Sequence, residues 1–204
     1  MTSLVVVSAG LSNPSSTRLL ADRLAAEVVE ALEDVEVTQV ELRGLAHQLT
    51  DQLLTGFPGP ELAAAEAAVA AADGLVVVTP VFSASYSGLF KTFFDVLPPG
   101  ALDGTPVLLA ATAGTARHSL VIEHALRPLF SHLRAVPVPT GVFAATDDFG
   151  DRGLQERVER AAGELATLMG KVAPSGTARR RRTVEDELAD PTPFEQLLRE
   201  ASGG

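Results

Sequence analysis

Three short apolar segments, separated by stretches with helical patterns, constrain the fold of this chain more than any other feature. They are residues 4–7, 75–78 and 106–112, with the sequences LVVV, LVVV and PVLLAAT. Such runs are typical of parallel strands that are buried on both faces of a sheet. Residues 35–42 alternate between apolar and polar side chains, which predicts a strand near a sheet edge, and residues 136–138 predict a short fifth strand.

Helical patterns fill the segments between these strands. From residue 15 to residue 32, apolar side chains recur at every fourth position, at Leu20, Leu24, Val28 and Leu32. The Ala-rich stretch 60–72 also favours a helix, because Pro60 suits a first turn. The remaining helices are predicted at 87–96, 120–133 and 153–172, with one short helix within 43–59.

Five strands that alternate with helices predict an α/β protein with a parallel sheet. Because crossovers between parallel strands are right-handed, few topologies remain. We therefore expect a flavodoxin-like, doubly wound, five-stranded parallel sheet in the order 2-1-3-4-5, with helices on both faces. This domain is predicted to span residues 1–172, and residues 173–204 are predicted to form a flexible linker and a C-terminal tail.

The predicted tail differs in composition from the rest of the chain. Four consecutive arginines at 179–182 are followed by an acidic stretch and by a hydrophobic and acidic end in which Phe194, Leu197 and Leu198 would share one helix face. Two interpretations remain: a disordered tail, or an arm that docks on a partner. We interpret the arginine run as a solvated linker that pairs with the neighbouring acidic residues, rather than as a nucleic-acid site.

Composition excludes several classes of function. The 26 acidic and 16 basic residues give a net charge of −10, which opposes binding to nucleic acid or to an anionic membrane. The chain has no cysteine, which excludes iron–sulfur and zinc–thiolate sites, so redox chemistry would need an organic cofactor. No signal peptide is expected at the N-terminus, and no apolar stretch approaches the roughly 20 residues of a membrane span. We therefore expect a cytoplasmic protein, with neither a metal site nor a covalent catalytic residue.

Ligands of an open parallel sheet bind outside the carboxyl ends of the strands, where the strand order reverses. For the predicted order, three loops meet at that point: residues 8–17, 79–87 and 112–119. All three loops are rich in Ser, Thr and Gly. This coincidence is the main functional signal in the sequence.

The first loop predicts a phosphate site. It leads into a helix N-terminus, where free backbone N–H groups and the helix dipole favour an anion. A single hydroxyl would suffice to cap the helix, but residues 12–17 of this loop have four, together with a preceding glycine that lets the backbone come close to a ligand. The candidate phosphate-binding residues are Gly10, Ser12, Ser15, Ser16 and Thr17. The chain has neither a G-x-G-x-x-G nor a G-x-x-x-x-G-K-[ST] motif, which leaves a phosphomonoester such as that of FMN.

The second loop offers a wall for a flat ring. Pro80, Val81, Phe82 and Ser83 follow the third predicted strand, and the apolar side chains among them could line one side of an isoalloxazine. For Phe82 and Tyr86, the sequence is equally compatible with contact to the ring and with packing in the core. The phenylalanines of the next helix, Phe90, Phe93 and Phe94, are expected in the core or in a dimer interface.

The third loop offers hydrogen-bond donors. Backbone N–H groups following Thr112, around Ala113 and Gly114, could contact the pyrimidine edge of a flavin, where negative charge accumulates on reduction. Arg117 and His118 are the nearest cationic candidates for the phosphate of a nicotinamide nucleotide, although an exposed Arg and a helix-capping His are equally compatible with the sequence.

Together the three loops resemble those of the NAD(P)H-dependent FMN reductases, in particular the group that supplies reduced flavin to two-component monooxygenases. The segments that carry the resemblance are SAGLSNPSST, TPVFSASYSGLFKTFFD and TAGTARHSLVIEHALRPLF. In the first loop, Ser15 matches the family pattern, whereas Gly10, Ser12 and Thr17 replace Ser, Arg and Asn. In the second loop, Ser87 replaces a proline, and the positions that match or nearly match are Pro80, Phe82, Ser85, Gly88 and Lys91.

The resemblance implies FMN as the flavin, NADPH or NADH as the hydride donor, and a protein that orients the two without a covalent intermediate. It also implies a homodimer, or a dimer of dimers, packed through the helix after the second loop, with the flavin sites near the interface. Other functions on the same fold remain open: a flavin carrier that ignores NAD(P)H, a quinone or azo reductase, or a subunit whose main task is docking to a monooxygenase.

Overall fold

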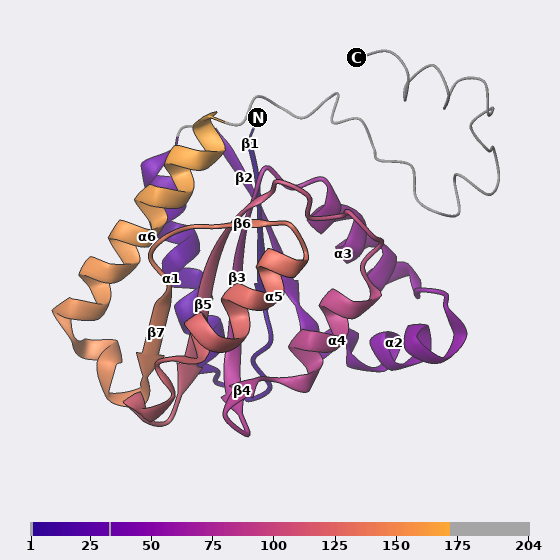
Figure 1. The fold of residues 1–204 in the computed structure, drawn as a ribbon, viewed down its shortest axis with the longest axis horizontal. Helices are drawn as coiled ribbons and strands as arrows, with labels where there is room; N and C mark the ends of the chain where they lie inside the picture. The colour runs from indigo at the N-terminus through magenta and orange to yellow at the C-terminus, as the bar shows by residue number, and fades with distance from the viewer. Residues whose placement is uncertain (1, 33, 172–204) are drawn as a thin grey trace, which may run out of the picture. The chain divides into compact units, whose positions relative to one another are not determined.

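A parallel sheet forms the centre of the protein in the computed structural model, which describes residues 2–32 and 34–171 (Figure 1). The strand order along the sheet is β2-β1-β3-β5-β6, and β7 also pairs with β5. All of these pairings are parallel. The strands are β1 (Thr2–Ser8), β2 (Val35–Glu41), β3 (Gly74–Phe82), β5 (Pro106–Ala113), β6 (Val136–Pro137) and β7 (Val142–Ala145).

This arrangement confirms the predicted sheet and its 2-1-3-4-5 order, with one change in its fifth strand. The prediction placed that strand at 136–138, but its pairing with β5 is divided between β6 and the unpredicted β7. The two are separated by Val138–Gly141, which contains Pro139, a residue that has no N–H to donate to a strand ladder.

A short hairpin was also not predicted. β4 (Ser85–Tyr86) pairs antiparallel with the end of β3, opposite Val81 and Phe82. The two residues that connect these strands, Ser83 and Ala84, have φ values of 49° and 69°. Positive φ at both central positions suits a tight hairpin, but glycine or asparagine normally signals such a turn in a sequence.

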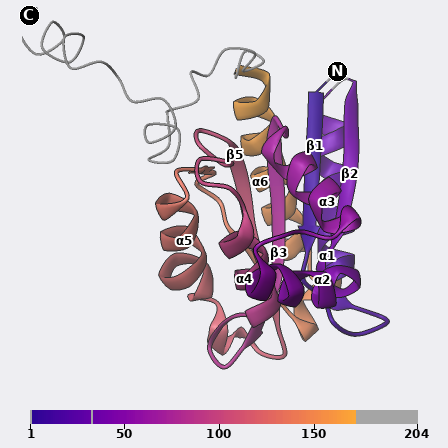
Figure 2. The same ribbon diagram turned by 90° about the vertical axis from the view of Figure 1, so that its right-hand side faces the viewer.

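Helices cover both faces of the sheet (Figures 1 and 2). On one face, α1 (Ser16–Ala31) and α6 (Arg152–Lys171) pack on Leu4, Val6, Val76 and Leu108. The other face is covered by four helices and a π-helical turn: α2 (Leu42–Thr55), α3 (Pro60–Ala70), α4 (Gly88–Val96), η2 (Ile122–Leu126) and α5 (Arg127–His132).

The helix predicted within 43–59 is longer than the single short helix that was expected. α2 has fourteen residues, and its buried side chains Leu42, Leu45, Leu49 and Gln52 recur at helical spacing. It ends at Gly56, whose φ of 80° suits a left-handed cap. The interrupting Gly44 and the polar residues on the outer face hide this pattern in the sequence.

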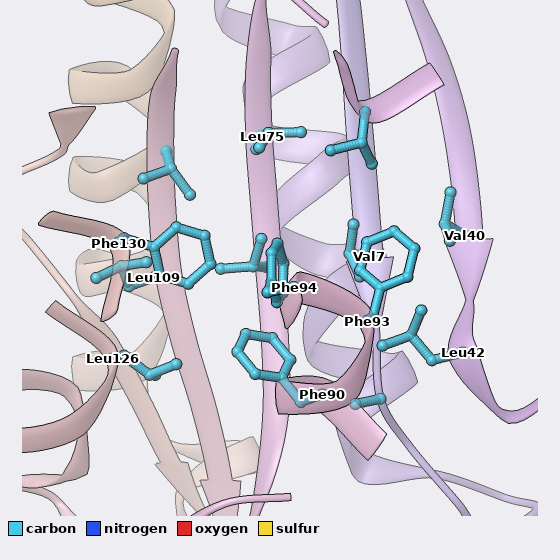
Figure 3. Packing of buried hydrophobic residues seen from close by; sticks show 14 of the residues in the cluster. Val7, Val40, Leu42, Leu75, Phe90, Phe93, Phe94, Leu109, Leu126 and Phe130 are labelled. Carbon is cyan, nitrogen blue, oxygen red and sulfur yellow. The ribbon is translucent and has the colours of Figure 1, made fainter. Parts of the chain in front are cut away.

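Four phenylalanines form the centre of the core beneath α4 and α5 (Figure 3). Phe90 and Phe94 have ring centroids 4.8 Å apart, and Phe94 contacts Phe130 edge-on at 4.9 Å. Phe93 completes the group at 5.3 Å from Phe94. All four side chains are buried within this chain, so they serve as core.

No helix of residues 2–32 and 34–171 is both long and apolar enough to cross a membrane. The predicted boundary at residue 172 and the tail at 173–204 lie outside the residues that the structure describes.

Two phenylalanines allow a matched test of this core. Phe130→Ala should destabilise the protein by about 3–5 kcal/mol, because it leaves a cavity between α5 and the sheet. Phe57→Ala should change stability by less than about 0.5 kcal/mol, since the side chain of Phe57 is 79% exposed. Urea denaturation of both variants measures the difference, and equal losses would contradict the packing described here.

Candidate functional site

A cavity of about 330 Å³ opens at the carboxyl ends of β1, β3 and β5. All three of the predicted loops contribute to its wall. Its lining residues are Leu11, Ser12, Ser16, Thr17, Pro80, Val81, Phe82, Thr112, Ala113, Gly114 and Thr146. None of these side chains is charged, so an anion bound here would be held by hydroxyl and backbone N–H groups.

The hydroxyls of the first loop divide into two roles. Ser12 and Ser16 are exposed and line the cavity. Thr17 is buried, and its hydroxyl lies 2.8 Å from the Thr112 hydroxyl, which joins the start of α1 to the end of β5. Ser15 is the N-cap of α1: its Oγ accepts a hydrogen bond from the Arg18 backbone N–H at 3.2 Å. Ser15 is therefore not in the cavity wall.

Gly10 does not line the cavity, and it packs closely against the side chains of Ser15 and Thr17. A Cβ at this position would lie 2.1 Å from Ser15 Oγ and 3.2 Å from Thr17 Cβ. Only glycine therefore lets the loop fold this closely against the first turn of α1. The observed contact is with the capping serine, and the close approach of this backbone to a phosphate stays a prediction.

The second loop presents Pro80, Val81 and Phe82 to the cavity, with the Phe82 side chain 48% exposed. Ser83 and Ser85 belong to the hairpin beyond them and do not line the cavity. The structure distinguishes the two aromatic residues for which both ring contact and core packing were considered. Tyr86 packs against the core, with its ring 6.0 Å from Phe90, whereas Phe82 faces the cavity.

The third loop brings Thr112, Ala113 and Gly114 to the cavity as predicted. Arg117 and His118 belong to the following short 3-10 helix, η1 (Ala116–His118), and both are exposed outside the cavity wall. Neither makes an ion pair with a residue of the described part of the chain.

Two of the lining residues, Leu11 and Thr146, were not among the predicted site residues. Thr146 begins η3 (Thr146–Gly150) directly after β7. Because β7 was not predicted, nothing placed this threonine at the carboxyl edge of the sheet. The apolar run VFAA before it is the signal that could have identified the strand.

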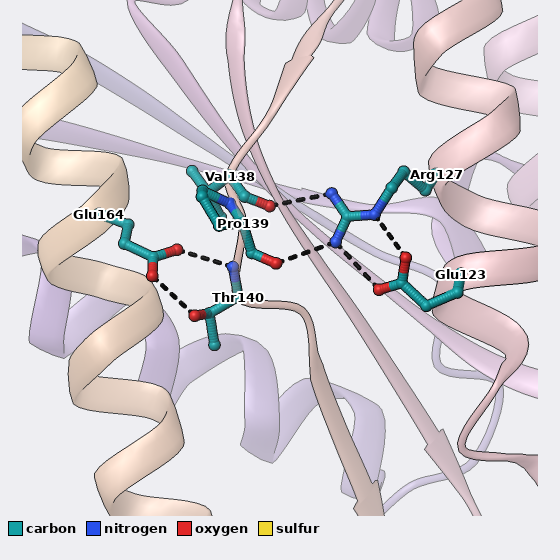
Figure 4. A network of polar contacts seen from close by, with 6 residues as sticks. All are labelled: Glu123, Arg127, Val138, Pro139, Thr140 and Glu164. Atoms are coloured by element: carbon teal, nitrogen blue, oxygen red, sulfur yellow. Dashed lines mark hydrogen bonds and ion pairs between the residues drawn. The ribbon is translucent and has the colours of Figure 1, made fainter.

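A polar network fixes the segment that leads into β7 (Figure 4). Arg127 donates to both carboxylate oxygens of Glu123, and also to the carbonyls of Val138 and Pro139. On the other side, Glu164 accepts hydrogen bonds from the N–H and the hydroxyl of Thr140, both at 2.7 Å. The hydrogen bonds from Arg127 lower the pKa of Glu123 below its usual value, so this carboxylate stays charged and holds its partner.

The chemistry of the cavity wall fits a flavin mononucleotide. Hydroxyls and free N–H groups at the start of α1 suit a phosphate, whereas Pro80, Val81 and Phe82 provide an apolar wall for a ring. The fold and this site together define the class of flavodoxin-like proteins, with the cavity at the carboxyl edge of the sheet as the candidate site for a mononucleotide flavin.

Comparison with known proteins agrees with this class. The profile of the NADPH-dependent FMN reductases matches residues 2–150. The chain is 41% identical over 172 residues to an FMN reductase (NADPH) of Pseudomonas aeruginosa, covering 82% of this chain and 92% of the relative. It is also 41% identical to the NADH-dependent FMN reductase SfnF of Pseudomonas fluorescens, covering 82% and 91%. The chain belongs to the NADPH-dependent FMN reductase family.

Solved structures support the same assignment. An oxidoreductase from Corynebacterium diphtheriae is 51% identical, with a TM-score of 0.82 over 85% of this chain and 99% of that one. The apo form of the NADH:FMN oxidoreductase EmoB is 31% identical, with a TM-score of 0.74 over 82% and 89%. This protein is accordingly an oxidoreductase that uses FMN and a nicotinamide nucleotide, as the three loops predicted.

Two glycines test the architecture of the first loop. Gly10→Ala should weaken FMN binding by about tenfold or more, because its Cβ would displace the Ser15 cap and Thr17. Gly44→Ala is the control, since a Cβ there meets nothing within 4 Å. Fluorescence titration with FMN measures both variants. Unchanged affinity in Gly10→Ala would show that the loop does not depend on this contact.

Proposed function

We propose that this cavity is the FMN site of an NAD(P)H-dependent FMN reductase, and that the reduced flavin is passed to a monooxygenase. One observation carries the proposal: three loops from distant parts of the sequence converge on a single cavity whose wall offers both hydroxyls and apolar groups. The monooxygenase partner rests on the resemblance of these loops to the reductases that serve two-component oxygenases.

In this proposal each loop contacts a different part of the flavin. Ser12, Ser16 and Thr17, with the N–H groups at the start of α1, would hold the phosphate. Pro80, Val81 and Phe82 would contact the ring, and the backbone around Ala113 and Gly114 would donate to its pyrimidine edge. Bound FMN supplies the hydride acceptor, and the chain contributes orientation and electrostatics.

A reductase fits this cavity better than a tight flavin carrier does. Phe82 is the one aromatic side chain in the described cavity wall, so a ring would not be enclosed between two aromatic planes. An open face leaves room for a nicotinamide to stack on the flavin. Quinone or azo reduction on the same site remains a second activity to test with the same preparation.

The activity test compares NADPH and NADH oxidation by the purified protein with and without FMN, followed by the absorbance of the reduced nicotinamide. We expect oxidation that depends on FMN, and the faster donor identifies the preferred nucleotide. Tight FMN binding without oxidation would instead indicate a carrier, and no FMN binding would contradict the site assignment.

We also propose that the protein is a homodimer, or a dimer of dimers, packed through α4 as the resemblance implies. A hollow of about 620 Å³ between α4 and α5 supports this, because partly buried apolar side chains line it together with an ion pair from Lys91 to Asp95. Tyr86, near the end of the second loop, also lines this hollow. A partner seated there would bring the interface close to the flavin.

Oligomeric state tests this interface. Pro128→Arg places a charge in the hollow at an exposed residue, and we expect it to reduce the mass measured by light scattering from that of a dimer to that of a monomer. Leu54→Arg is the control, because Leu54 is exposed on α2 and does not line the hollow. A wild-type monomer, or a dimer in both variants, would overturn the proposed interface.

Two further expectations stay as proposals. The acidic composition supports a cytoplasmic protein that binds neither nucleic acid nor membranes. The tail predicted at 173–204 is either a disordered segment or a docking arm. Truncation after Val172, followed by measurement of flavin transfer to a monooxygenase, distinguishes the two.

A further inference from the structure

A second hollow, of about 420 Å³, lies beside the flavin cavity and plays no part in the proposed flavin site. Its wall includes Ala116 and Ser119 from the third loop, and Ile122 and Phe143 as apolar surface. A volume of this size is within the range of small-molecule sites.

The two cavities border the same two chain segments. Gly114 and Thr146 line the flavin cavity, and the residues two positions further along each segment, Ala116 and Asp148, line the second hollow. A ligand that occupies the second hollow would therefore be a near neighbour of a group bound in the first. A dinucleotide whose reactive half reaches the flavin needs such a neighbouring site for its other half.

Arg157 gives this hollow a cation that is available to a ligand. One guanidinium nitrogen, Nη1, donates to the Phe143 carbonyl at 3.2 Å, which holds the side chain against β7. Among the described residues, Arg157 makes no ion pair and no other side-chain hydrogen bond. The guanidinium thus keeps donors for a phosphate, the group that its planar fork recognises best.

Two carboxylates share the hollow with Arg157, and neither neutralises it. Glu123 is paired through both oxygens with Arg127. Asp148 accepts a hydrogen bond from the Ala145 N–H through Oδ2 at 2.8 Å. Its other oxygen makes no hydrogen bond to the described residues, and a carboxylate oxygen is an acceptor for sugar hydroxyls.

We propose that this hollow binds the adenosine monophosphate half of the nicotinamide nucleotide, with Arg157 on its phosphate and Asp148 on ribose hydroxyls. The combination of one available cation, one acceptor for hydroxyls and an apolar wall matches phosphate, ribose and base in a single ligand. Arg117, in η1 at the rim, is a flanking cation that lines neither cavity. The inference rests on the proposed reductase activity, whose hydride donor it places.

The test compares Arg157→Gln with Arg160→Gln. Glutamine removes the charge but keeps an amide that can donate to the Phe143 carbonyl. Arg160 is exposed one turn further along α6 and lines neither cavity, so its variant is the matched control. Two donors are used: NAD(P)H, and reduced nicotinamide mononucleotide, which lacks the adenosine monophosphate half. Calorimetric titration with ADP measures binding without turnover.

We expect Arg157→Gln to raise the KM for NAD(P)H and the Kd for ADP by about tenfold or more. This is the effect expected from the loss of one charged hydrogen bond. Turnover of the mononucleotide, FMN affinity and Tm should stay at wild-type values, and Arg160→Gln should behave as wild type. Equal losses with both donors, or unchanged ADP binding, would overturn the inference. A wild-type protein that oxidises neither donor would instead refute the reductase activity itself.

Discussion

The parallel pairing of β1, β3 and β5 is the constraint on which the rest of the structure depends. Ser8 lies opposite Val78, and Pro80 lies opposite Thr112, so the three strands end at one edge of the sheet. Because each loop begins where its strand ends, the loops can meet only there. The hydrogen bond between Thr17 and Thr112 then ties the first loop to the third, across 95 residues of sequence.

The sequence was sufficient to predict this central part. Buried strands rich in Val and Leu leave little freedom in their assignment, and ten of the eleven lining residues lie in the three predicted loops at the ends of these strands. The unpredicted parts have separate physical causes. β4 depends on two left-handed residues that are not glycine, and β7 is a short strand after a proline, so Thr146 could not be placed.

No charged side chain lines the cavity wall, where Ser12 stands in place of the arginine that is usual in the family pattern. In the proposed flavin site, the helix dipole and the hydroxyls would therefore balance the phosphate charge. Cationic groups instead stand outside the wall, at Arg117 and Arg157, where the second nucleotide is proposed to bind.

The most direct test of this account is calorimetric titration of FMN and riboflavin against the wild-type protein and Ser16→Ala. Riboflavin lacks only the phosphate, so the difference between the two ligands isolates the contribution of the first loop. The account predicts that FMN binds the wild type far more tightly than riboflavin does, and that Ser16→Ala weakens FMN alone, by about tenfold. Equal affinity for both ligands, or an equal loss for both in the variant, would contradict a phosphate site at the start of α1.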